Sequence, residues 1–312
     1  MKRSLLLVLL LLAIQIVEAQ EKFIFTPQWT PQAQFAGYYV AQDMGFYREA
    51  GLDVEIVHPS ATQPALNRVF KNESQATTLQ LCQAMEVIAS GVPMVNILQT
   101  SMNNALVIVS RRGVSPLTQK GARVGCWAAG FGQLAFYLDD KEHLEYEWVP
   151  AASTVNLFVK GLLDACIAMS YNEYYQLVQS GMEFSEESVY RFCDHDYNIQ
   201  EDGIYMRRDY YEAHKEQAQK FAEASRRGWE WAAEHPDETL DIVMKYVHDL
   251  HVITNRPMQR LMLEEILRLQ LDRESGEREF RLRPDMVQLA NNLLLESGIL
   301  LSPVPYEQLI AR

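Results

Sequence analysis

The amino-acid sequence predicts an α/β fold with two lobes, each built on an open, mainly parallel sheet flanked by helices. Its 312 residues suffice for about two domains. Short apolar strands alternate with helix-like segments from residue 22 to about residue 200, a pattern typical of parallel sheets covered on both faces. From residue 208 the pattern changes to almost continuous helix. No linker rich in proline, serine or glycine interrupts the sequence, so we expect short hinge strands between the lobes.

The first cycle of strands and helices covers residues 22–110. Apolar residues at helical spacing, such as Phe35 and Met44, predict a helix over 33–49 that ends before Gly51. The other expected elements of this cycle are strands at 22–29, 53–58, 75–81, 95–100 and 105–110 and helices at 64–69 and 83–89.

The second cycle begins at Arg123 and passes through a glycine-rich turn at Gly130 and Gly132. Pro236 then opens a helix at its first turn, and acidic residues follow it, as is favourable at a helix N-terminus. The expected elements are strands at 123–127, 145–149, 165–169 and 188–193, helices at 133–137, 154–160 and 173–181, and C-terminal helices at 208–233, 240–247, 256–271 and 284–297.

Composition and charge exclude several classes of protein. Hydrophobic residues make up 48% and charged residues 22%, which is close to the globular average and excludes a disordered, fibrous or polytopic membrane protein. The formal net charge is −13, and no run of lysine and arginine is longer than two residues. Proteins that bind nucleic acid or anionic membranes need clustered basic residues. We therefore expect no nucleic-acid partner.

Residues 1–19 have the layout of a secretory signal peptide. Lys2 and Arg3 precede an apolar run, and Val17 and Ala19 are the small residues of a cleavage site before Gln20. The alternative is a membrane anchor, but the apolar stretch is shorter than the roughly 20 residues that span a bilayer. Cleavage would change the net charge from −13 to −14. The expected location is the periplasm.

The four cysteines do not form a metal or redox motif. Cys82, Cys126, Cys166 and Cys193 are 44, 40 and 27 residues apart, and no C-x-x-C is present. An exported protein permits disulfides. Each cysteine, however, stands in an apolar, strand-like context, so we favour buried thiols.

The sequence lacks the motifs of common enzymes. It has no G-x-S-x-G, no phosphate-binding loop and no H-E-x-x-H. The run from Cys193 to Asp196 resembles a metal cluster only superficially, because neighbouring residues of a strand point to opposite faces. We therefore predict no catalytic residues, no metal and no cofactor.

Aromatic and amide residues gather at the ends of the predicted strands. Ligands of open α/β sheets bind beyond the carboxyl ends of the strands. Flat rings with a few amides and one carboxylate suit a planar, hydrogen-bonding molecule that is neutral or weakly cationic. The alternative is that these side chains pack in the core or the hinge. The predicted ligand-binding residues are Trp29, Gln34, Tyr38, Gln99, Trp127, Tyr171, Asn172 and Glu173.

Glu173 carries most of this prediction. At a helix start its carboxylate would complement the helix dipole by about 0.3–1 kcal/mol. In a cleft it would instead accept a bidentate, charge-assisted hydrogen bond from an amino-substituted ring. Asn172 would then cap the helix. A carboxylate in the pocket also disfavours anions such as sulfonates and phosphates.

Segments in three parts of the sequence carry a family resemblance. WTPQAQFAGYYVA at 29–41, followed by GFYREAGLDVEI at 45–56, resembles the opening of exported solute-binding proteins of ABC importers, in the group that binds thiamine pyrimidine precursors and alkanesulfonates. Asp164-Ala165 with YNEY at 171–174 is similar to a later segment of that family, and HPDE at 235–238 also fits.

The resemblance implies a type II periplasmic-binding-protein fold. Two lobes would close on a ligand around a hinge, with residues 20–110 and 203–312 forming the first lobe and 111–202 the second. Trp29 and Glu173 map onto positions that hold an aminopyrimidine ring. The loop 59–63 lacks the glycine often found there.

The expected function is capture of a small heteroaromatic metabolite, similar to a thiamine pyrimidine precursor, for the membrane permease of an ABC importer, by a monomeric protein. One alternative is an enzyme similar to the pyrimidine-precursor synthases, which carry clustered cysteines that this chain lacks. Another is an extracellular ligand-sensing module with the same fold.

Overall fold

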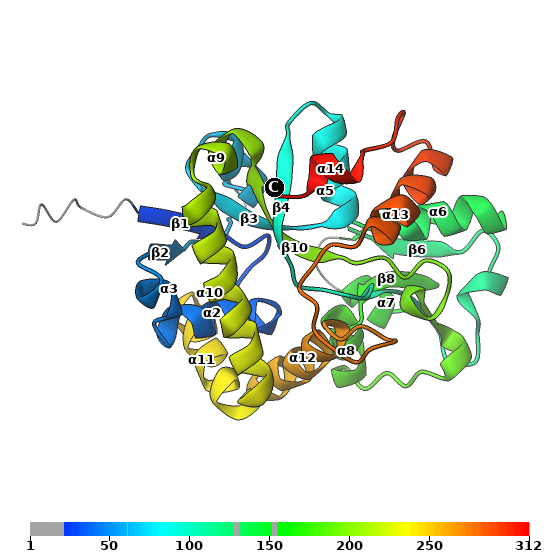
Figure 1. The fold of residues 1–312 in the computed structure, drawn as a ribbon. Helices are drawn as coiled ribbons and strands as arrows, with labels where there is room; N and C mark the ends of the chain where they lie inside the picture. Colours follow the sequence, from blue (N-terminus) through cyan, green and yellow to red (C-terminus); the bar gives the residue numbers. More distant parts are fainter. Residues whose placement is uncertain (1–21, 61, 128–130, 152–154, 312) are drawn as a thin grey trace, which may run out of the picture.

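The computed structural model describes residues 22–60, 62–127, 131–151 and 155–311, and it has two lobes (Figure 1). The predicted signal peptide lies outside the described residues. The first sheet contains, in spatial order, β2 (Asp53–Ile56), β1 (Lys22–Thr26), β3 (Ala76–Gln80), β10 (Asp202–Arg207) and β4 (Met94–Gln99). The second sheet contains β7 (Glu147–Pro150), β6 (Arg123–Cys126), β8 (Ala165–Met169), β5 (Leu106–Ser110) and β9 (Val189–Arg191).

Both sheets are mixed but mainly parallel, because in each sheet four strands share one direction and one strand opposes them. β1 pairs in parallel with β2 and β3, and β6 pairs in parallel with β7 and β8. By contrast, β10 is antiparallel to β3 and β4, and β5 is antiparallel to β8 and β9. These two strands are the ones by which the chain enters a sheet from the other lobe. They run in the opposite direction to their neighbours because no crossover helix turns the chain round first.

The chain crosses between the lobes twice. β5 pairs within the second sheet, so the first crossing lies between Gln99 and Leu106, earlier in the chain than the expected boundary at residue 110. The return crossing lies between Asp194 and Asp202. An apolar run such as 105–110 fits the interior of either sheet, and for that reason the sequence did not distinguish them.

Helices cover the sheets of both lobes (Figure 1). The helices of the first lobe are η1 (Ala33–Phe35), α2 (Ala36–Asp43), α3 (Phe46–Glu49), α4 (Ala65–Phe70), α5 (Leu81–Ala89), α9 (Arg208–Ala213), α10 (Lys215–Glu234), α11 (Pro236–Asp249), α12 (Arg256–Leu269), α13 (Pro284–Glu296) and α14 (Tyr306–Leu309). Those of the second lobe are η2 (Pro116–Thr118), α6 (Gln133–Glu142), α7 (Asn156–Val159), α8 (Glu173–Gln179), η3 (Glu186–Ser188) and η4 (Phe192–Asp194).

The predicted helix over 33–49 is divided into η1, α2 and α3. Gly45 separates α2 from α3 and has a φ of 81°, a left-handed conformation that glycine adopts without steric cost.

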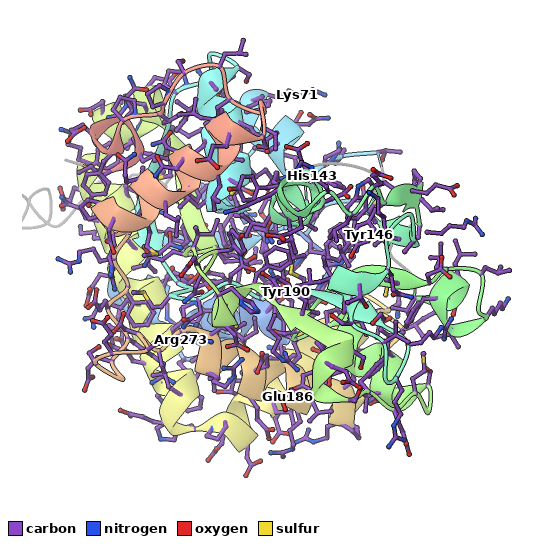
Figure 2. All side chains as sticks on the ribbon, turned by 90° about the vertical axis from the view of Figure 1, so that its right-hand side faces the viewer. Lys71, His143, Tyr146, Glu186, Tyr190 and Arg273 are labelled. Carbon is purple, nitrogen blue, oxygen red and sulfur yellow. The ribbon has the colours of Figure 1, made fainter. Side chains whose placement is uncertain are left out.

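Strand β5 shows how alternation builds a core on each face of the second sheet. Val107 and Val109 pack with Phe158 of α7 and Leu177 of α8, while Ile108 belongs to the cluster on the opposite face, where α6 packs. Figure 2, which faces the second lobe, shows Tyr146 and Tyr190 among closely packed side chains. All four cysteines are free thiols and buried, which confirms the predicted burial. Within the described residues, no helix combines the length and apolarity needed to cross a membrane.

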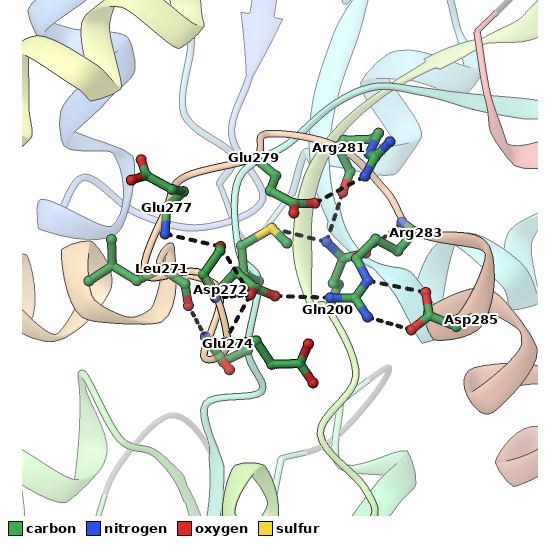
Figure 3. Close-up of polar contacts among 12 residues, drawn as sticks. Gln200, Leu271, Asp272, Glu274, Glu277, Glu279, Arg281, Arg283 and Asp285 are labelled. Carbon is green, nitrogen blue, oxygen red and sulfur yellow. Dashed lines mark hydrogen bonds and ion pairs between the residues drawn. The ribbon is translucent and has the colours of Figure 1, made fainter.

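The C-terminal segment 271–283 forms hydrogen bonds with both crossings (Figure 3). Asn103 of the first crossing donates its Nδ2 to the Leu271 carbonyl oxygen at 2.7 Å, and Gln200 of the second donates its Nε2 to the Arg281 carbonyl oxygen at 2.8 Å. An ion pair of 2.9 Å between Asp272 and Arg283 closes this segment on itself. Since α12 also contacts α8, and α13 contacts α6, the C-terminal helices reach the second lobe on both sides of the hinge.

Gly228 on α10 permits the close packing of α10 against α2. A Cβ atom there would lie 2.0 Å from the Gly37 carbonyl oxygen, so the Gly228→Ala variant is expected to lose roughly 2 kcal/mol of unfolding free energy despite the better helix propensity of alanine. Urea denaturation measures this, with the exposed Gln219→Ala change on the same helix as control. Equal stabilities of the two variants would contradict the close approach.

Candidate functional site

An aromatic contact joins the two lobes at the ends of β1 and β6. Trp29 follows β1, and Trp127 follows β6. The ring of Phe131, from the second lobe, lies 6.4 Å from the Trp29 ring and 6.2 Å from the Trp127 ring, with interplanar angles of 86° and 77°. The two predicted tryptophans are therefore brought together through a third ring.

The lobes are in contact around this point. The Tyr137 hydroxyl on α6 donates to Glu296 on α13 at 2.6 Å, and Gln133 donates to Glu86 across the lobes. A cavity between the lobes, next to the hinge, has a volume of only about 10 Å³, which is room for about one water molecule. The two lobes therefore contact each other directly beside the hinge.

Glu173 is a buried carboxylate at the first position of α8. Its Oε2 accepts a hydrogen bond of 3.0 Å from the Met169 backbone N–H, and its Oε1 accepts one of 3.4 Å from Asn172 Nδ2. Burial raises the pKa of Glu173, while hydrogen bonds, including one from Trp127, act in the opposite direction. Several N–H donors thus favour the ionised form of a carboxyl group that is only 7% exposed.

A second carboxylate, Asp202, lies at the start of β10. Its Oδ2 accepts a hydrogen bond of 2.6 Å from Gln34 Nε2, and its Oδ1 accepts one of 3.1 Å from Gln28 Nε2. Burial raises the pKa of Asp202, and the two glutamine amides oppose that rise. Gln28 Oε1 is buried and has no hydrogen-bond partner among the described residues. Near Trp29 the first lobe therefore offers acceptor atoms that remain free to bind a donor.

Tyr171 lies among these acidic groups. Burial raises the pKa of its hydroxyl well above the usual value, and the charges of Asp202, Glu201 and Glu173 add to that rise. Burial also raises the pKa of Glu201 to about 8, with a further contribution from the Asp202 charge. Glu201 is consequently mostly protonated at pH 7, whereas Asp202 and Glu173 have hydrogen-bond donors that favour the carboxylate form.

His58 supports the turn that carries Trp29. Its Nδ1–H donates to the Trp29 carbonyl oxygen at 2.6 Å, so its Nε2 accepts from the Tyr39 hydroxyl at 2.8 Å. Burial lowers the pKa of His58 to about 4. The imidazole is therefore neutral at pH 7 and fixed in one tautomer.

Two of the predicted ligand-binding residues, Tyr38 and Gln99, are buried and have partners within the protein. Tyr38 is 1% exposed in the core of the first lobe and packs edge-on against Phe25 and Trp229. Gln99 is fully buried in the hinge, where its Nε2 donates to the carbonyl oxygens of Ser101 and Asp202. Tyr38 thus packs in the first lobe and Gln99 holds the crossing, and a contact of either residue with the ligand stays a prediction.

Asn172 has a different role from the one expected. It occupies the N-cap position of α8, but its side chain makes no capping hydrogen bond. Its Oδ1 accepts instead from Gln176 Nε2 at 2.9 Å. Gln34, by contrast, contacts the site through Asp202.

Sequence reasoning missed Asp202, Gln28 and His58. Asp202 stands at the start of a strand, whereas ligands of parallel sheets are expected beyond the carboxyl ends of the strands. It reaches the cleft only because β10 is antiparallel. His58 closes an expected strand, and nothing in that position marks it as a support for Trp29. Gln28 precedes Trp29 directly, and its place at the end of an expected strand was the available signal.

Within the described residues, no group of three or more histidine, cysteine, aspartate or glutamate side chains is arranged to hold a metal ion. The side chains gathered at the cleft are aromatic rings, amides and carboxylates. Such a set stacks on a ring and accepts hydrogen bonds from it.

Comparison with known proteins gives relatives in sequence. The chain is 27% identical over 271 residues to the formylaminopyrimidine-binding protein of Halalkalibacterium halodurans. This alignment covers 82% of this chain and 78% of the relative. It is also 27% identical over 183 residues to a putative thiamine biosynthesis protein of Haemophilus influenzae, covering 54% of this chain and 58% of that protein.

Solved structures share the fold. The periplasmic aliphatic sulphonate-binding protein SsuA of Escherichia coli superposes with a TM-score of 0.67 at 13% identity, covering 94% of this chain and 93% of that one. The CA3427 gene product of Candida albicans, described as having the generic periplasmic-binding-protein fold, gives a TM-score of 0.62 at 16% identity, with 91% of each chain covered. The expected two-lobed fold is thereby confirmed.

The NMT1/THI5-like family matches residues 32–239, which is more than half of the chain. This match confirms the resemblance inferred from the opening motif. The chain belongs to the NMT1/THI5-like family.

Proposed function

We propose that this protein binds a small aminopyrimidine-type solute between its two lobes and delivers it to the permease of an ABC importer. The observation that carries the proposal is the pairing of Trp29 and Trp127, through Phe131, beside two carboxylates that accept hydrogen bonds. The sequence relative from Halalkalibacterium halodurans, named for binding a formylaminopyrimidine, supports the same ligand class.

The chemistry of the cleft favours a donor-rich ring over an anion. Glu173 and Asp202 present carboxylate oxygens, and Gln28 presents an unpartnered amide oxygen. An amino-substituted pyrimidine donates N–H groups to such acceptors and offers its flat face to an indole ring. A sulfonate would meet carboxyl and amide oxygens that accept hydrogen bonds, in a chain whose net charge is −13. The fold is shared with a sulphonate-binding protein, but the charge of the cleft differs from what a sulfonate requires.

Isothermal titration calorimetry tests the ligand class directly. The panel contains a formylaminopyrimidine, the unformylated aminopyrimidine, thiamine and an alkanesulfonate. We expect one of the aminopyrimidines to bind most tightly and the sulfonate not to bind. Binding of the sulfonate in the absence of any response to the pyrimidines would overturn the proposed ligand class.

We propose binding without turnover. The cleft residues described above stack and accept hydrogen bonds, and all four cysteines are buried thiols distributed over both lobes. Mass spectrometry of a ligand recovered after prolonged incubation is expected to show it unchanged. A modified ligand would instead favour the enzyme alternative.

Delivery to an importer requires export. The predicted signal peptide of residues 1–19 supports a periplasmic location. Cell fractionation combined with N-terminal sequencing is expected to find the mature chain in the periplasm, beginning at Gln20. Size-exclusion chromatography is expected to show a monomer, whereas retention of residues 1–19 on a membrane-bound chain would support the anchor alternative.

A further inference from the structure

A second pocket lies between the second lobe and α12, at the flank of the hinge. It has a volume of about 270 Å³, and Ser170, Tyr174, Arg191, Asp194, Glu265 and Arg268 are among its lining residues. None of these residues lines the small cavity between the lobes, and none lines a further cavity of about 20 Å³ whose lining includes Trp127 and Glu173. The pocket is therefore separate from the candidate ligand site.

Both carboxylates of this pocket are already occupied by partners. Glu265 accepts a hydrogen bond of 2.6 Å from Ser170 Oγ and two from Arg268, whose Nε and Nη2 lie at 2.8 and 2.7 Å. Asp194 pairs with Arg273 at 2.7 Å. The Arg268 pair keeps Glu265 ionised, because it lowers the pKa of Glu265 against the effect of burial.

Arg191 remains without an acceptor. Its guanidinium carbon lies 5.0 Å from the centre of the Tyr174 ring. Among the described residues, the guanidinium group of Arg191 makes no hydrogen bond and no ion pair. Its side chain is only partly exposed. Arg191, Arg268 and Arg273 thus give three positive charges against the two negative charges of Asp194 and Glu265, in a protein whose net charge is −13.

We propose that this pocket binds a small oxyanion, a phosphate or a carboxylate, with Arg191 as the principal contact. A planar guanidinium with free N–H groups matches two oxygens of such an anion, and its stacking on Tyr174 holds it in position. Arg268 uses Nε and Nη2 for Glu265, which leaves its Nη1 group for a third contact. A bound oxyanion would connect α12 to the second lobe beside the existing bond between Ser170 and Glu265.

Calorimetric titration with inorganic phosphate and, in a separate arm, with malonate tests this site. Chloride keeps the ionic strength constant, so that general screening does not contribute. We expect saturable binding of at least one of the two anions, and the arm that responds identifies the preferred oxyanion. The Arg191→Gln variant is expected to weaken that binding at least about tenfold, since hydrogen bonds between charged groups are stronger than neutral ones.

The matched control is Arg256→Gln, which removes the same charge from the first turn of α12, away from the pocket. It is expected to change anion binding less than about twofold, a difference well within one tenfold step of affinity. Arg191→Lys, which keeps the charge and loses the planar fork, should fall between the native protein and Arg191→Gln. Thermal melting confirms that each variant is folded. Absence of saturable binding in both arms, or equal affinities of native protein and Arg191→Gln, overturns the proposal.

Discussion

Replacing Glu173 with glutamine is expected to weaken binding of the cleft ligand by at least about tenfold, because a hydrogen bond to a charged group contributes roughly 1.5–3 kcal/mol. The substitution preserves the shape of the side chain and removes its charge. Both oxygens of the buried carboxylate accept hydrogen bonds. In glutamine one of them is replaced by an NH₂ group, which faces the ligand's N–H donors and cannot accept from them. Calorimetry with the aminopyrimidine that binds the native protein most tightly measures the change.

The chain supplies a matched control for this experiment. Glu201 is also buried near Tyr171, but its pKa of about 8 means that it is mostly protonated at pH 7. Glu201→Gln therefore replaces a neutral group with a neutral group and should change affinity less than about threefold at pH 7, far below the effect of losing a charged hydrogen bond. Equal effects of the two substitutions would mean that losing the charge of Glu173 does not weaken binding, and would remove Glu173 from the charged binding contacts.

Much of the fold could be predicted because periodicity reports burial. The alternation of strands and helices indicated two α/β lobes, and the helical character after residue 208 indicated the C-terminal helices. The direction of individual strands was not available from the same signal. Val107, Ile108 and Val109 are buried whichever sheet they join, so their apolar character could not show that β5 pairs antiparallel in the second lobe.

The candidate site was predictable where it follows parallel strands. Trp29, Trp127 and Glu173 stand after β1, β6 and β8, and the structure gathers them as expected. Asp202 was missed because it begins an antiparallel strand, and only the reversed direction of β10 brings that end to the cleft. Gln99 follows the same local pattern as Trp29, yet its amide is used by the hinge backbone. A position at a strand end therefore identifies candidate ligand-binding residues. The hydrogen bonds that each side chain makes within the protein show which of them remain available for a ligand.

Between about pH 4 and pH 6.5, His58 is expected to make the unfolding free energy depend on pH, and the His58→Gln variant should not show this dependence. The native pKa of about 4 lies below the unfolded value of about 6.5, so between these limits the unfolded chain binds a proton that the folded chain excludes. The contribution of His58 to stability is therefore complete above pH 6.5, decreases as the pH falls, and is lost by about pH 4. The whole decrease corresponds to roughly 3 kcal/mol.

The comparison between variants isolates this effect from Glu201. The raised pKa of Glu201 makes the folded chain bind the extra proton, so its contribution to stability decreases as the pH rises through about 8, opposite in sign to that of His58. Because Glu201 is present in both proteins, it cancels in the difference between native protein and His58→Gln. Urea denaturation at pH 7 and pH 4.5 should show that difference shrinking by roughly 2–3 kcal/mol at the lower pH. A difference that stays constant, or an NMR titration of the His58 ring near pH 6.5, would show that the imidazole is not held neutral beneath Trp29, and the turn that carries the indole would then need another support.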